Sequence, residues 1–456
     1  MSTDGLKVAV TKMQDVGVGA AAIASFERYY RILEQGISGY IRESEISPLP
    51  KLPHLNPTAA PTADDLAALD KTVLIKLNGG LGTSMGLQAA KSLLPVRNGL
   101  TFLDIIARQV LATRAATGAR LPLIFMNSFR TADDTEQVLA KYPELAVAGL
   151  PSGFLQNQEP KLHRDSLSPV DWPADPELEW CPPGHGDIYP ALFDAGLITE
   201  LLKQGYRFAF VSNADNLGAT PDARMAGWFA QSGAPFAVEL SRKTPADIKG
   251  GQVVVQKHDG RLVLREIAQT HPDDLADFMD ANKHKYFNTN NLWLNLAALQ
   301  NELARTNGVL ELPLIANAKT VDPADPMSPA VIQLESAMGA AVGVFPGATA
   351  IEVGRERFLP VKTTADLLLL QSDIFELTDD YRLNRLSEPP LVKLSPPYQT
   401  IAGFQQRFPH GSPRLRDAKS FTVDGDYTFG ANTMVTGAAL LPPGTGHIPD
   451  NTIISG

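Results

Sequence analysis

The chain of 456 residues has a single cysteine, Cys181, so no disulfide can form within it. It lacks any uninterrupted apolar run of about 18 residues, the length that a transmembrane helix needs. Its first residues, MSTDGLKVAV, lack the basic start and apolar centre of a secretory signal. These absences predict a cytoplasmic protein without membrane contacts. Cys181 follows Trp180 and has no activating base beside it, so we expect a packing residue rather than a nucleophile.

The sequence also lacks an excess of positive charge. It has 40 Lys and Arg residues against 50 Asp and Glu residues, a formal net charge of -10. An acidic chain is a poor candidate for holding a nucleic acid backbone. A few lysines and backbone N–H groups can still make a cleft locally positive. The balance therefore favours a small anionic substrate over a polyanion.

The length predicts two or three domains. Ile23, Phe26, Tyr30 and Leu33 recur at helical spacing, and the prolines over 48–61 indicate an extended connector. We therefore predict an N-terminal helical segment and linker over 1–70 that packs outside the active site. A catalytic domain is predicted over 71–385, and a small C-terminal domain over 386–456.

Strand and helix patterns alternate in the central region. Apolar runs predict strands over 72–77, 123–127, 207–212 and 236–240, and helical patterns fall over 62–70, 101–113, 131–140 and 191–203. This alternation predicts an α/β fold with a mostly parallel sheet covered by helices on both faces. Ligands of such sheets bind at the carboxyl ends of the strands. A hairpin is expected over 252–267, and helices over 331–345 and 364–374.

The C-terminal region has a different pattern. Short β-like runs over 421–423, 427–429, 433–435 and 439–441 are separated by Gly425, Gly430 and Gly437. Short strands at a regular interval predict a small β-helix-like domain.

The most informative stretch is residues 72–91, TVLIKLNGGLGTSMGLQAAK. Four glycines (Gly79, Gly80, Gly82 and Gly86) and then Lys91 follow a predicted buried strand. Backbone N–H groups of such a loop can converge on phosphate, and a lysine adds positive charge. A dinucleotide fingerprint would need glycine at Met85, and a P-loop would need glycine at both Met85 and Ala90, so neither motif is present. The alternative is a strand-to-helix turn that binds nothing.

Two further polar clusters could contact a nucleotide. In FLQNQEPK, the amide of Gln156 offers a donor and an acceptor that can pair with the edge of a base. In PPGHGDIY, glycines on both sides of His185 let a ligand approach, and the imidazole can donate to a phosphate or sugar hydroxyl. The alternatives are a polar surface loop and a turn with a satisfied histidine.

Three other clusters suit a metal, a sugar and an anion. Asp215 follows a buried strand in SNADNLG and could hold Mg²⁺ or cap the next turn. KGG at 249–251, Glu266 and the amides of FNTNNLW suit sugar hydroxyls, although asparagine clusters usually form turns. Lys362 precedes a helix capped by Thr363 or Thr364 and could hold an anion there, or it could be a solvated surface residue.

Taken in order, these motifs resemble the UDP-glucose pyrophosphorylases (UTP–glucose-1-phosphate uridylyltransferases) of the eukaryotic type. The matching motifs are LNGGLGTSMG, PPGHGDIY, SNADNLGA, KGG, EIAQ, FNTNNLW, NAKT, VIQLESAMGAA and RFLPVKTTADLLL. The resemblance runs over about 76–371 and resumes at FTVDGDYTFG. It departs at Ala90, where the family has proline, at residues 157–159, and at Ala214, where the family has a larger apolar residue. It implies a Rossmann-like, GT-A-like nucleotidyltransferase fold.

The resemblance also implies a role for each matching residue. Lys91 and Lys362 would be the catalytic residues that face the reacting phosphates, and Asp215 would bind Mg²⁺, the expected cofactor. The nucleotide, with its uracil on Gln156, would be held by Leu77, Asn78, Gly79, Gly80, Gln156, Gly184 and Asp215. The sugar phosphate would be held by His185, Asn213, Gly250, Glu266, Asn288, Thr289, Asn290 and Lys362.

The implied reaction joins UTP and glucose 1-phosphate into UDP-glucose and pyrophosphate, reversibly. Glucose 1-phosphate already carries a nucleophilic oxygen, so positioning and charge neutralisation suffice. One alternative is a UDP-sugar or UDP-N-acetylhexosamine pyrophosphorylase. Another is a non-catalytic scaffold that binds a UDP-sugar, and a homo-oligomer is expected to form through the C-terminal β segment.

Overall fold

The structure is a computed structural model that describes residues 3–36, 39–56, 59–82, 85–87, 89–244 and 247–456. Pro57 of the predicted connector lies outside these residues, as do Thr83, Ser84 and Gln88 of the glycine loop. No helix in the described ranges is long and apolar enough to cross a membrane.

A seven-stranded sheet forms the centre of the molecule, with strand order β17-β11-β14-β10-β2-β5-β6. Its strands are β2 (Thr72–Asn78), β5 (Leu123–Asn127), β6 (Gly153–Leu155), β10 (Phe208–Asn213), β11 (Phe236–Arg242), β14 (Tyr286–Asn295) and β17 (Thr349–Glu352). All neighbours pair in parallel except β14, which is antiparallel to both β10 and β11. The predicted mixed, mostly parallel α/β fold is confirmed.

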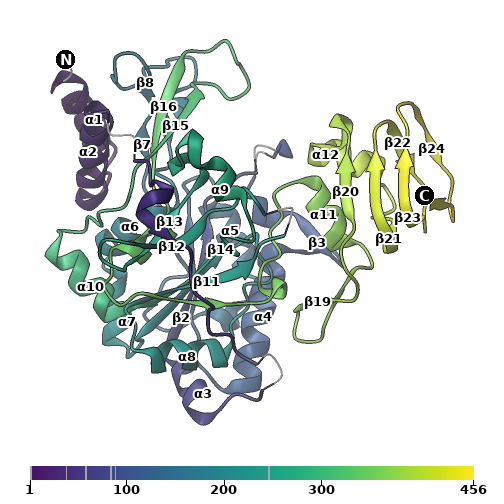
Figure 1. The fold of residues 1–456 in the computed structure, drawn as a ribbon, viewed down its shortest axis with the longest axis horizontal. Coiled ribbons are helices and arrows are strands. Elements are labelled where there is room, and N and C mark those ends of the chain that lie inside the picture. The colour runs from purple at the N-terminus through teal and green to yellow at the C-terminus, as the bar shows by residue number, and fades with distance from the viewer. Residues whose placement is uncertain (1–2, 37–38, 57–58, 83–84, 88, 245–246) are drawn as a thin grey trace.

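Helices cover both faces of this sheet (Figure 1). Alternate residues of β2 point to opposite faces: Leu74 packs with α3, α4 and α8, whereas Val73 and Ile75 pack with α6, α7 and α10. These helices are α3 (Ala63–Asp70), α4 (Phe102–Thr117), α6 (Ile188–Asp194), α7 (Leu197–Lys203), α8 (Ala223–Ser232) and α10 (Leu296–Arg305), with α5 (Ala132–Leu139) beside α4. Burial on both faces explains why the strands read as continuous apolar runs.

Helix starts follow local capping rules. Thr101 caps α4 by accepting from Asp104 N, while the Asp104 side chain accepts from Thr101 N. The same reciprocal pair of bonds begins α3 at Thr62, and begins α11 (Thr364–Gln371) at Thr363. Because each box is made within four residues, the sequence alone is sufficient to predict these three starts.

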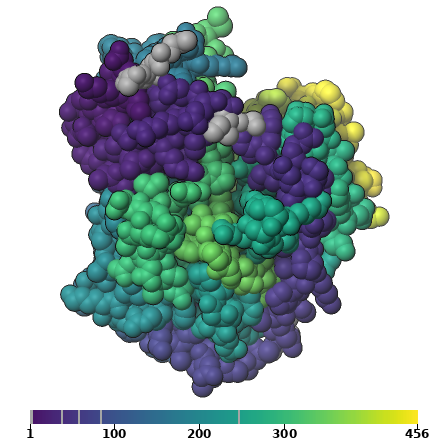
Figure 2. Space-filling view, turned by 60° about the vertical axis from the view of Figure 1, so that its left-hand side comes forward, coloured from purple at the N-terminus to yellow at the C-terminus, as the bar shows by residue number. Residues whose placement is uncertain are grey.

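The N-terminal segment packs beside the central domain. Helices α1 (Thr3–Asp15) and α2 (Ala20–Glu34) lie together at one end of the molecule (Figures 1 and 2). The strand β1 (Ile46–Ser47) then pairs with the predicted hairpin, β12 (Gln252–Gln256) and β13 (Leu262–Arg265). The segment therefore contributes a strand as well as helices, and the domain boundary at residue 70 stays a prediction.

Short strands complete the central region. They are β3 (Pro95–Arg97) with β4 (Leu100–Thr101), β7 (Glu159–Pro160) with β9 (Trp180–Cys181), β8 (Leu162–His163) with β15 (Ile315–Thr320) and β16 (Ala330–Glu335), and β18 (Phe375–Leu377) with β19 (Leu383–Arg385). A short helix, α9 (Leu275–Met279), follows the hairpin. Cys181 is buried in β9, and burial raises the pKa of its thiol well above the usual value, as a packing residue requires.

Two helix predictions were wrong. Residues 331–345 contain all of β16 after Ala330 and the 3₁₀ segment Met338–Gly343 instead of one helix. Val331 and Leu334 are buried at a spacing that also suits a helix, but pairing with β15 and β8 decides for a strand. The single helix predicted over 191–203 is two helices, because Gly196 adopts a positive φ of 63° between them.

The C-terminal residues form parallel strands, as predicted for a β-helix-like domain. One sheet has the order β20-β21-β23-β25 and the other pairs β22 with β24. These strands are β20 (Leu391–Leu394), β21 (Arg414–Val423), β22 (Asp426–Phe429), β23 (Met434–Leu441), β24 (Thr445–Ile448) and β25 (Ile453–Ser455), and α12 (Ile401–Arg407) lies between β20 and β21. The runs predicted at 433–435 and 439–441 belong to one strand, β23. The apolar cluster around α4 and α11 continues into this region, and the boundary at residue 385 stays a prediction.

Candidate functional site

A cleft of about 280 Å³ lies where β2 and β10 end. Ten of the residues predicted from the sequence line it: Leu77, Asn78, Gly79, Gly80, Lys91, Gln156, Gly184, His185, Asn213 and Asp215. They come from separate segments of the chain. The carboxyl edge of the parallel strands brings them together, as the strand alternation predicts.

Lys91 and Asp215 face each other across this cleft. Lys91 Nζ donates to Asp215 Oδ2 at 2.6 Å, and the two side chains are 15% and 23% exposed. Lys91 N donates to Gly80 O at 3.1 Å, so the glycine loop holds the lysine backbone. Ala214 N donates to Leu77 O at 2.9 Å, which joins the two strand ends. A partly exposed cation and anion are thus available to a ligand that enters here.

Lys362 lies next to the same strand end. Val361 N donates to Asp215 O at 3.3 Å, and Pro360 pairs with Asn216 in an isolated bridge. The Lys362 side chain is exposed. Lys91, Asp215 and Lys362 therefore share one edge of the sheet instead of lying on separate surfaces.

The side chain of Asn78 is already used within the protein. It is buried and donates to Asn127 Oδ1 at 2.9 Å and to Thr135 Oγ1 at 2.8 Å. Its backbone is the part that can face a ligand. Gly79 is pressed against the Gln156 side chain, because a Cβ at position 79 would lie 2.5 Å from Gln156 Oε1. A side chain at position 79 would push that amide away from its place.

The loop that carries Gln156 is fixed at its backbone. Gln156 N donates to Asn127 O at 2.7 Å, at the end of β5. The next residue, Asn157, gives two bonds to Asp187: its backbone N to Oδ2 at 2.6 Å and its Nδ2 to Oδ1 at 2.9 Å. Asp187 is buried, and this burial raises its pKa to about 7 despite both bonds.

His185 is held as a neutral imidazole. Its Nδ1 accepts from Met338 N at 2.8 Å, and burial lowers its pKa to about 4. The Nε2–H is then free to donate at neutral pH. Gly184 beside it has a φ of 76°, and a Cβ there would lie 2.7 Å from Ser336 O. Glycine is thus required at this position for conformation and for space.

Five of the residues predicted for the sugar phosphate lie outside the lining of the 280 Å³ cleft: Gly250, Glu266, Asn288, Thr289 and Asn290. Asn288 N donates to Gly251 O at 2.7 Å, and Asn288 Nδ2 donates to Asn290 Oδ1 at 2.9 Å. Burial raises the pKa of Glu266, and the charge of Lys362 opposes this rise. The charge of Lys362 thus acts on this group from beside the Asp215 end of the cleft.

Two residues of this predicted group, Thr289 and Gly250, have no side-chain group left for a ligand. Thr289 is buried and donates through Oγ1 to Glu239 O at 2.7 Å, so its hydroxyl is used within the sheet. Gly250 packs against Phe287: a Cβ built on the glycine would lie 3.5 Å from the Phe287 Cβ. Both residues can offer backbone groups to a sugar.

A buried polar network under the cleft was not predicted. Glu239 on β11 accepts two bonds of 2.7 Å from Arg357, one from Trp293 Nε1 at 2.9 Å and one from Asn291 Nδ2 at 3.0 Å. Asn216 Nδ2 donates to Arg357 O at 3.1 Å, and its Oδ1 accepts from Leu359 N at 2.8 Å. The network therefore ties the Asp215 loop to the segment that ends at Lys362. The sequence signal for this network is Glu239, a charged residue within the apolar run FAVEL.

Lys76, a buried residue of β2, holds the loop that contains Asp215 from inside the protein. It is buried, and Nζ donates to Ser212 Oγ and to Ala219 O, both at 2.8 Å. Burial and the nearby Arg357 lower its pKa to about 7. The lysine thus bridges the two ends of the loop that contains Asp215.

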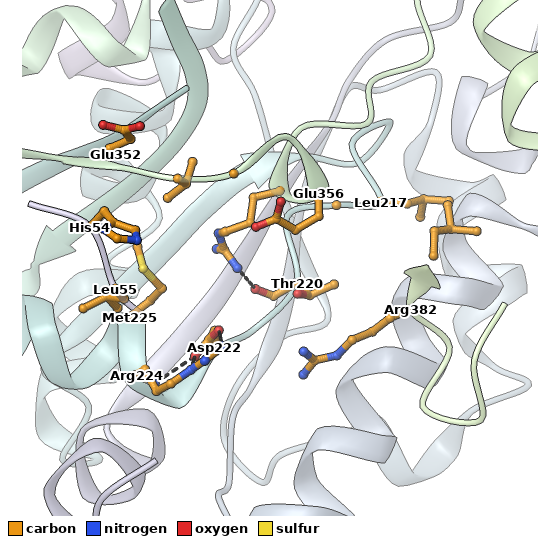
Figure 3. A pocket seen from close by; sticks show the side chains of 15 residues that line it. His54, Leu55, Leu217, Thr220, Asp222, Arg224, Met225, Glu352, Glu356 and Arg382 are labelled. Atoms are coloured by element: carbon orange, nitrogen blue, oxygen red, sulfur yellow. Dashed lines mark hydrogen bonds and ion pairs between the residues drawn. The ribbon is translucent and has the colours of Figure 1, made fainter. Parts of the chain in front are cut away.

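A second cavity, of about 460 Å³, lies against the other side of this loop (Figure 3). Leu217 and Thr220 line it, together with Arg224, which pairs with Asp222 at 2.7 Å. Arg382 points into it from the segment that leads into β19. None of the predicted site residues lines this cavity, so it is separate from the candidate cleft.

Known proteins are similar to this chain over most of its length. A family model described as UTP--glucose-1-phosphate uridylyltransferase matches residues 23–436. The UTP--glucose-1-phosphate uridylyltransferase of Hordeum vulgare is 37% identical over 466 residues, which cover 99% of this chain and 95% of the relative. The enzyme of that name from Saccharomyces cerevisiae is 39% identical over 398 residues, which cover 86% of this chain and 78% of the relative.

Solved structures are similar over the full length. A mutant UDP-glucose pyrophosphorylase from Leishmania major, in complex with UDP-glucose, has a TM-score of 0.91 at 40% identity and covers 100% of this chain and 99% of its own. The UDP-glucose phosphorylase from Trypanosoma brucei has a TM-score of 0.89 at 40% identity, with 100% of both chains covered. The similarity therefore includes the cleft and the C-terminal strands.

Proposed function

Because the chain belongs to the UTP–glucose-1-phosphate uridylyltransferase family, we propose that its cleft makes UDP-glucose and pyrophosphate from UTP and glucose 1-phosphate. The observation that carries this proposal is the grouping of Lys91, Asp215 and Lys362 at one sheet edge. Two anionic substrates can meet only where their charge is neutralised.

The reaction is a direct exchange at the α-phosphorus of UTP. A phosphate oxygen of glucose 1-phosphate attacks this atom and forms the new P–O bond. The bond to the bridging oxygen of the leaving pyrophosphate breaks, and pyrophosphate takes the electron pair. No proton moves, so the cleft needs to supply alignment and charge rather than a general base.

The nucleotide binds along the glycine loop in this proposal. Backbone groups of residues 77–80 hold the triphosphate, with Gly184 on the opposite wall. The amide of Gln156 pairs with uracil, because it offers a donor and an acceptor side by side. Its contact with Gly79 supports this placement, since it sets the amide directly beside the phosphate loop.

Lys91 and Lys362 are the proposed catalytic residues. Lys91 moves from Asp215 to the phosphates when substrates bind, and Lys362 approaches them from the other side. Each ammonium neutralises charge that develops in the transition state, worth about 2–4 kcal/mol if its loss resembles the loss of one oxyanion donor.

Asp215 is the proposed ligand of Mg²⁺. The ion takes oxygen ligands and is usually held by one or two carboxylates plus substrate phosphates, which fits a single partly exposed carboxylate beside the phosphate loop. The described ranges contain no group of three His, Cys, Asp or Glu side chains that could hold a metal alone. When bound, the ion would neutralise phosphate charge.

The sugar phosphate binds on the opposite side of the reacting phosphorus. His185 and Asn213 contact it from the cleft, with His185 donating through Nε2–H. The hexose lies against Gly250, Glu266, Asn288, Thr289 and Asn290. A carboxylate and several amides suit sugar hydroxyls, which both donate and accept. A cytoplasmic location and assembly through the C-terminal strands stay predictions.

The test is a coupled assay of pyrophosphate release with UTP, Mg²⁺ and one sugar 1-phosphate at a time. We expect turnover with glucose 1-phosphate, and much less with the N-acetylglucosamine and galactose analogues. Lys91→Ala and Lys362→Ala should each lower kcat by about 10²–10³-fold without changing the thermal midpoint. Lys203→Ala, at an exposed lysine of α7, is the control. Near-normal release by either catalytic variant would count against the assignment.

A further inference from the structure

We propose that Asp187 is a positioning residue for base recognition, and that it acts by holding Asn157, the residue that follows Gln156. This inference rests on the proposed function, because it takes Gln156 as the group that reads uracil. It adds a residue that touches no substrate and yet sets how strictly the base is chosen.

The geometry for this role is a clamp between two loops. Both carboxylate oxygens of Asp187 are engaged by Asn157, Oδ2 by the backbone N at 2.6 Å and Oδ1 by Nδ2 at 2.9 Å. On the other side, Gln156 N donates to Asn127 O at 2.7 Å. Gln156 is therefore fixed at its own backbone and at the next residue.

The loop needs such a clamp because no strand or helix holds it. β6 ends at Leu155 and β7 begins at Glu159, so Gln156 and Asn157 lie between regular elements. A site rejects the wrong base strictly when its own polar groups cannot move away from the mismatch. A loop released from Asp187 could relax around cytosine as well as uracil.

Asp187 itself is firmly placed. It is 3% exposed and closes the 3₁₀ turn that begins at His185. The titratable groups around it are Glu159 on β7, Tyr29 on α2 and Asp194 on α6. Its bonds come from Asn157 amides, so a carboxylate is the suitable partner: two acceptor oxygens meet two N–H donors.

This complementarity gives a sharp exchange experiment. Asn157→Asp sets a carboxylate against a carboxylate and is the mismatched single variant. Asp187→Asn keeps one oxygen for the Asn157 backbone N–H, and the Asn157 side chain can turn its own Oδ1 to accept from the new amide, so this variant keeps the clamp. The double variant Asn157→Asp/Asp187→Asn restores a donor opposite an acceptor, with the roles reversed. It also keeps the number of buried polar groups, which protects the fold.

The readouts are the Kd for UTP by calorimetry, the ratio of UTP to CTP affinity, and the KM for glucose 1-phosphate. We expect Asn157→Asp to weaken UTP binding by about tenfold and to lower the UTP-to-CTP ratio, and Asp187→Asn to stay within about threefold of the original chain. The KM for glucose 1-phosphate should change less than about twofold in both variants. The double variant should recover UTP affinity to within about threefold. Asp194→Asn removes a nearby charge without touching Asn157 and should change neither ratio nor Kd.

An Asn157→Asp variant that binds UTP like the original chain would overturn the proposal. So would a double variant as weak as Asn157→Asp, because that result would mean a general structural role. The proposed function is judged separately: absence of pyrophosphate release by the unmodified chain would overturn it, whereas UTP binding alone decides the clamp.

Discussion

The two halves of the cleft are each supported by a buried carboxylate, and the two carboxylates have different partners. The half of the cleft beside Asp215, where we propose that the phosphates bind, is called the phosphate half. Beneath it, Glu239 accepts two bonds of 2.7 Å from the Arg357 guanidinium. The half beside Gln156, where we propose that uracil binds, is called the base half. Beneath it, Asp187 accepts two bonds from the neutral amide groups of Asn157. Burial lowers the pKa of Arg357, but the charge and hydrogen bonds of Glu239 outweigh this effect and raise it, while burial raises the pKa of Asp187 to about 7.

This difference matches what each half handles. A carboxylate and a guanidinium cancel, so the Glu239–Arg357 pair ties the Asp215 loop to the Lys362 segment without adding net charge of its own. In the proposed function the base half reads an uncharged ring, and the amide bonds from Asn157 fix its loop. Support by an ion pair is costly to break on one side, because the remaining charge stays buried.

The largest expected effect comes from breaking the charged support. Arg357→Met leaves Glu239 buried without its cation and should lower the free energy of unfolding by about 3–5 kcal/mol, measured by urea denaturation. Arg305→Met is the matched control, because Arg305 pairs with Glu302 on the exposed surface of α10, and it should leave the free energy of unfolding almost unchanged. Equal losses of unfolding free energy in the two variants would show that the buried pair stabilises the fold no more than the exposed pair does.

A smaller effect should appear in the pH dependence of the amide support. The pKa of Asp187 rises from 3.8 to about 7 on folding, so the folded state binds this proton more tightly. The stabilisation is complete below about pH 4 and is lost as pH rises to about 7. The unfolding free energy of the original chain minus that of Asp187→Asn should fall by about 1 kcal/mol between about pH 6 and pH 7. A flat difference from about pH 5 to pH 8 would contradict the buried acid.

Features that depend on nearby residues could be predicted from the sequence. The capping boxes at Thr101 and Thr363 are made within four residues, and the strands that end at Asn78 and Asn213 are apolar runs followed by polar loops. The site residues at those strand ends follow from the edge rule for parallel sheets. For this reason the amino-acid sequence is sufficient to place the glycine loop and Asp215 at the same edge of the sheet.

Features that depend on distant pairing could not be predicted. Arg357 meets Glu239 across 118 residues, and the sequence offers only an isolated glutamate in an apolar strand. Asp187 belongs to the motif PPGHGDIY, but its partner Asn157 lies 30 residues earlier. The helix predicted over 331–345 failed for the same reason, because the partner strand β15 decided the local structure. Tertiary contacts override local periodicity at 331–345, and they supply the partners of Glu239 and Asp187 that local sequence does not indicate.

The central claim is that both anions meet in this cleft and react directly, and the stereochemistry at the α-phosphorus tests it. The chain would be given glucose 1-phosphate and UTP made chiral by sulfur at the α-phosphorus, and the configuration of the UDP-glucose analogue would be determined. A single in-line attack predicts inversion. Retention would show that a group of the protein first takes the uridylyl unit, which would contradict the account.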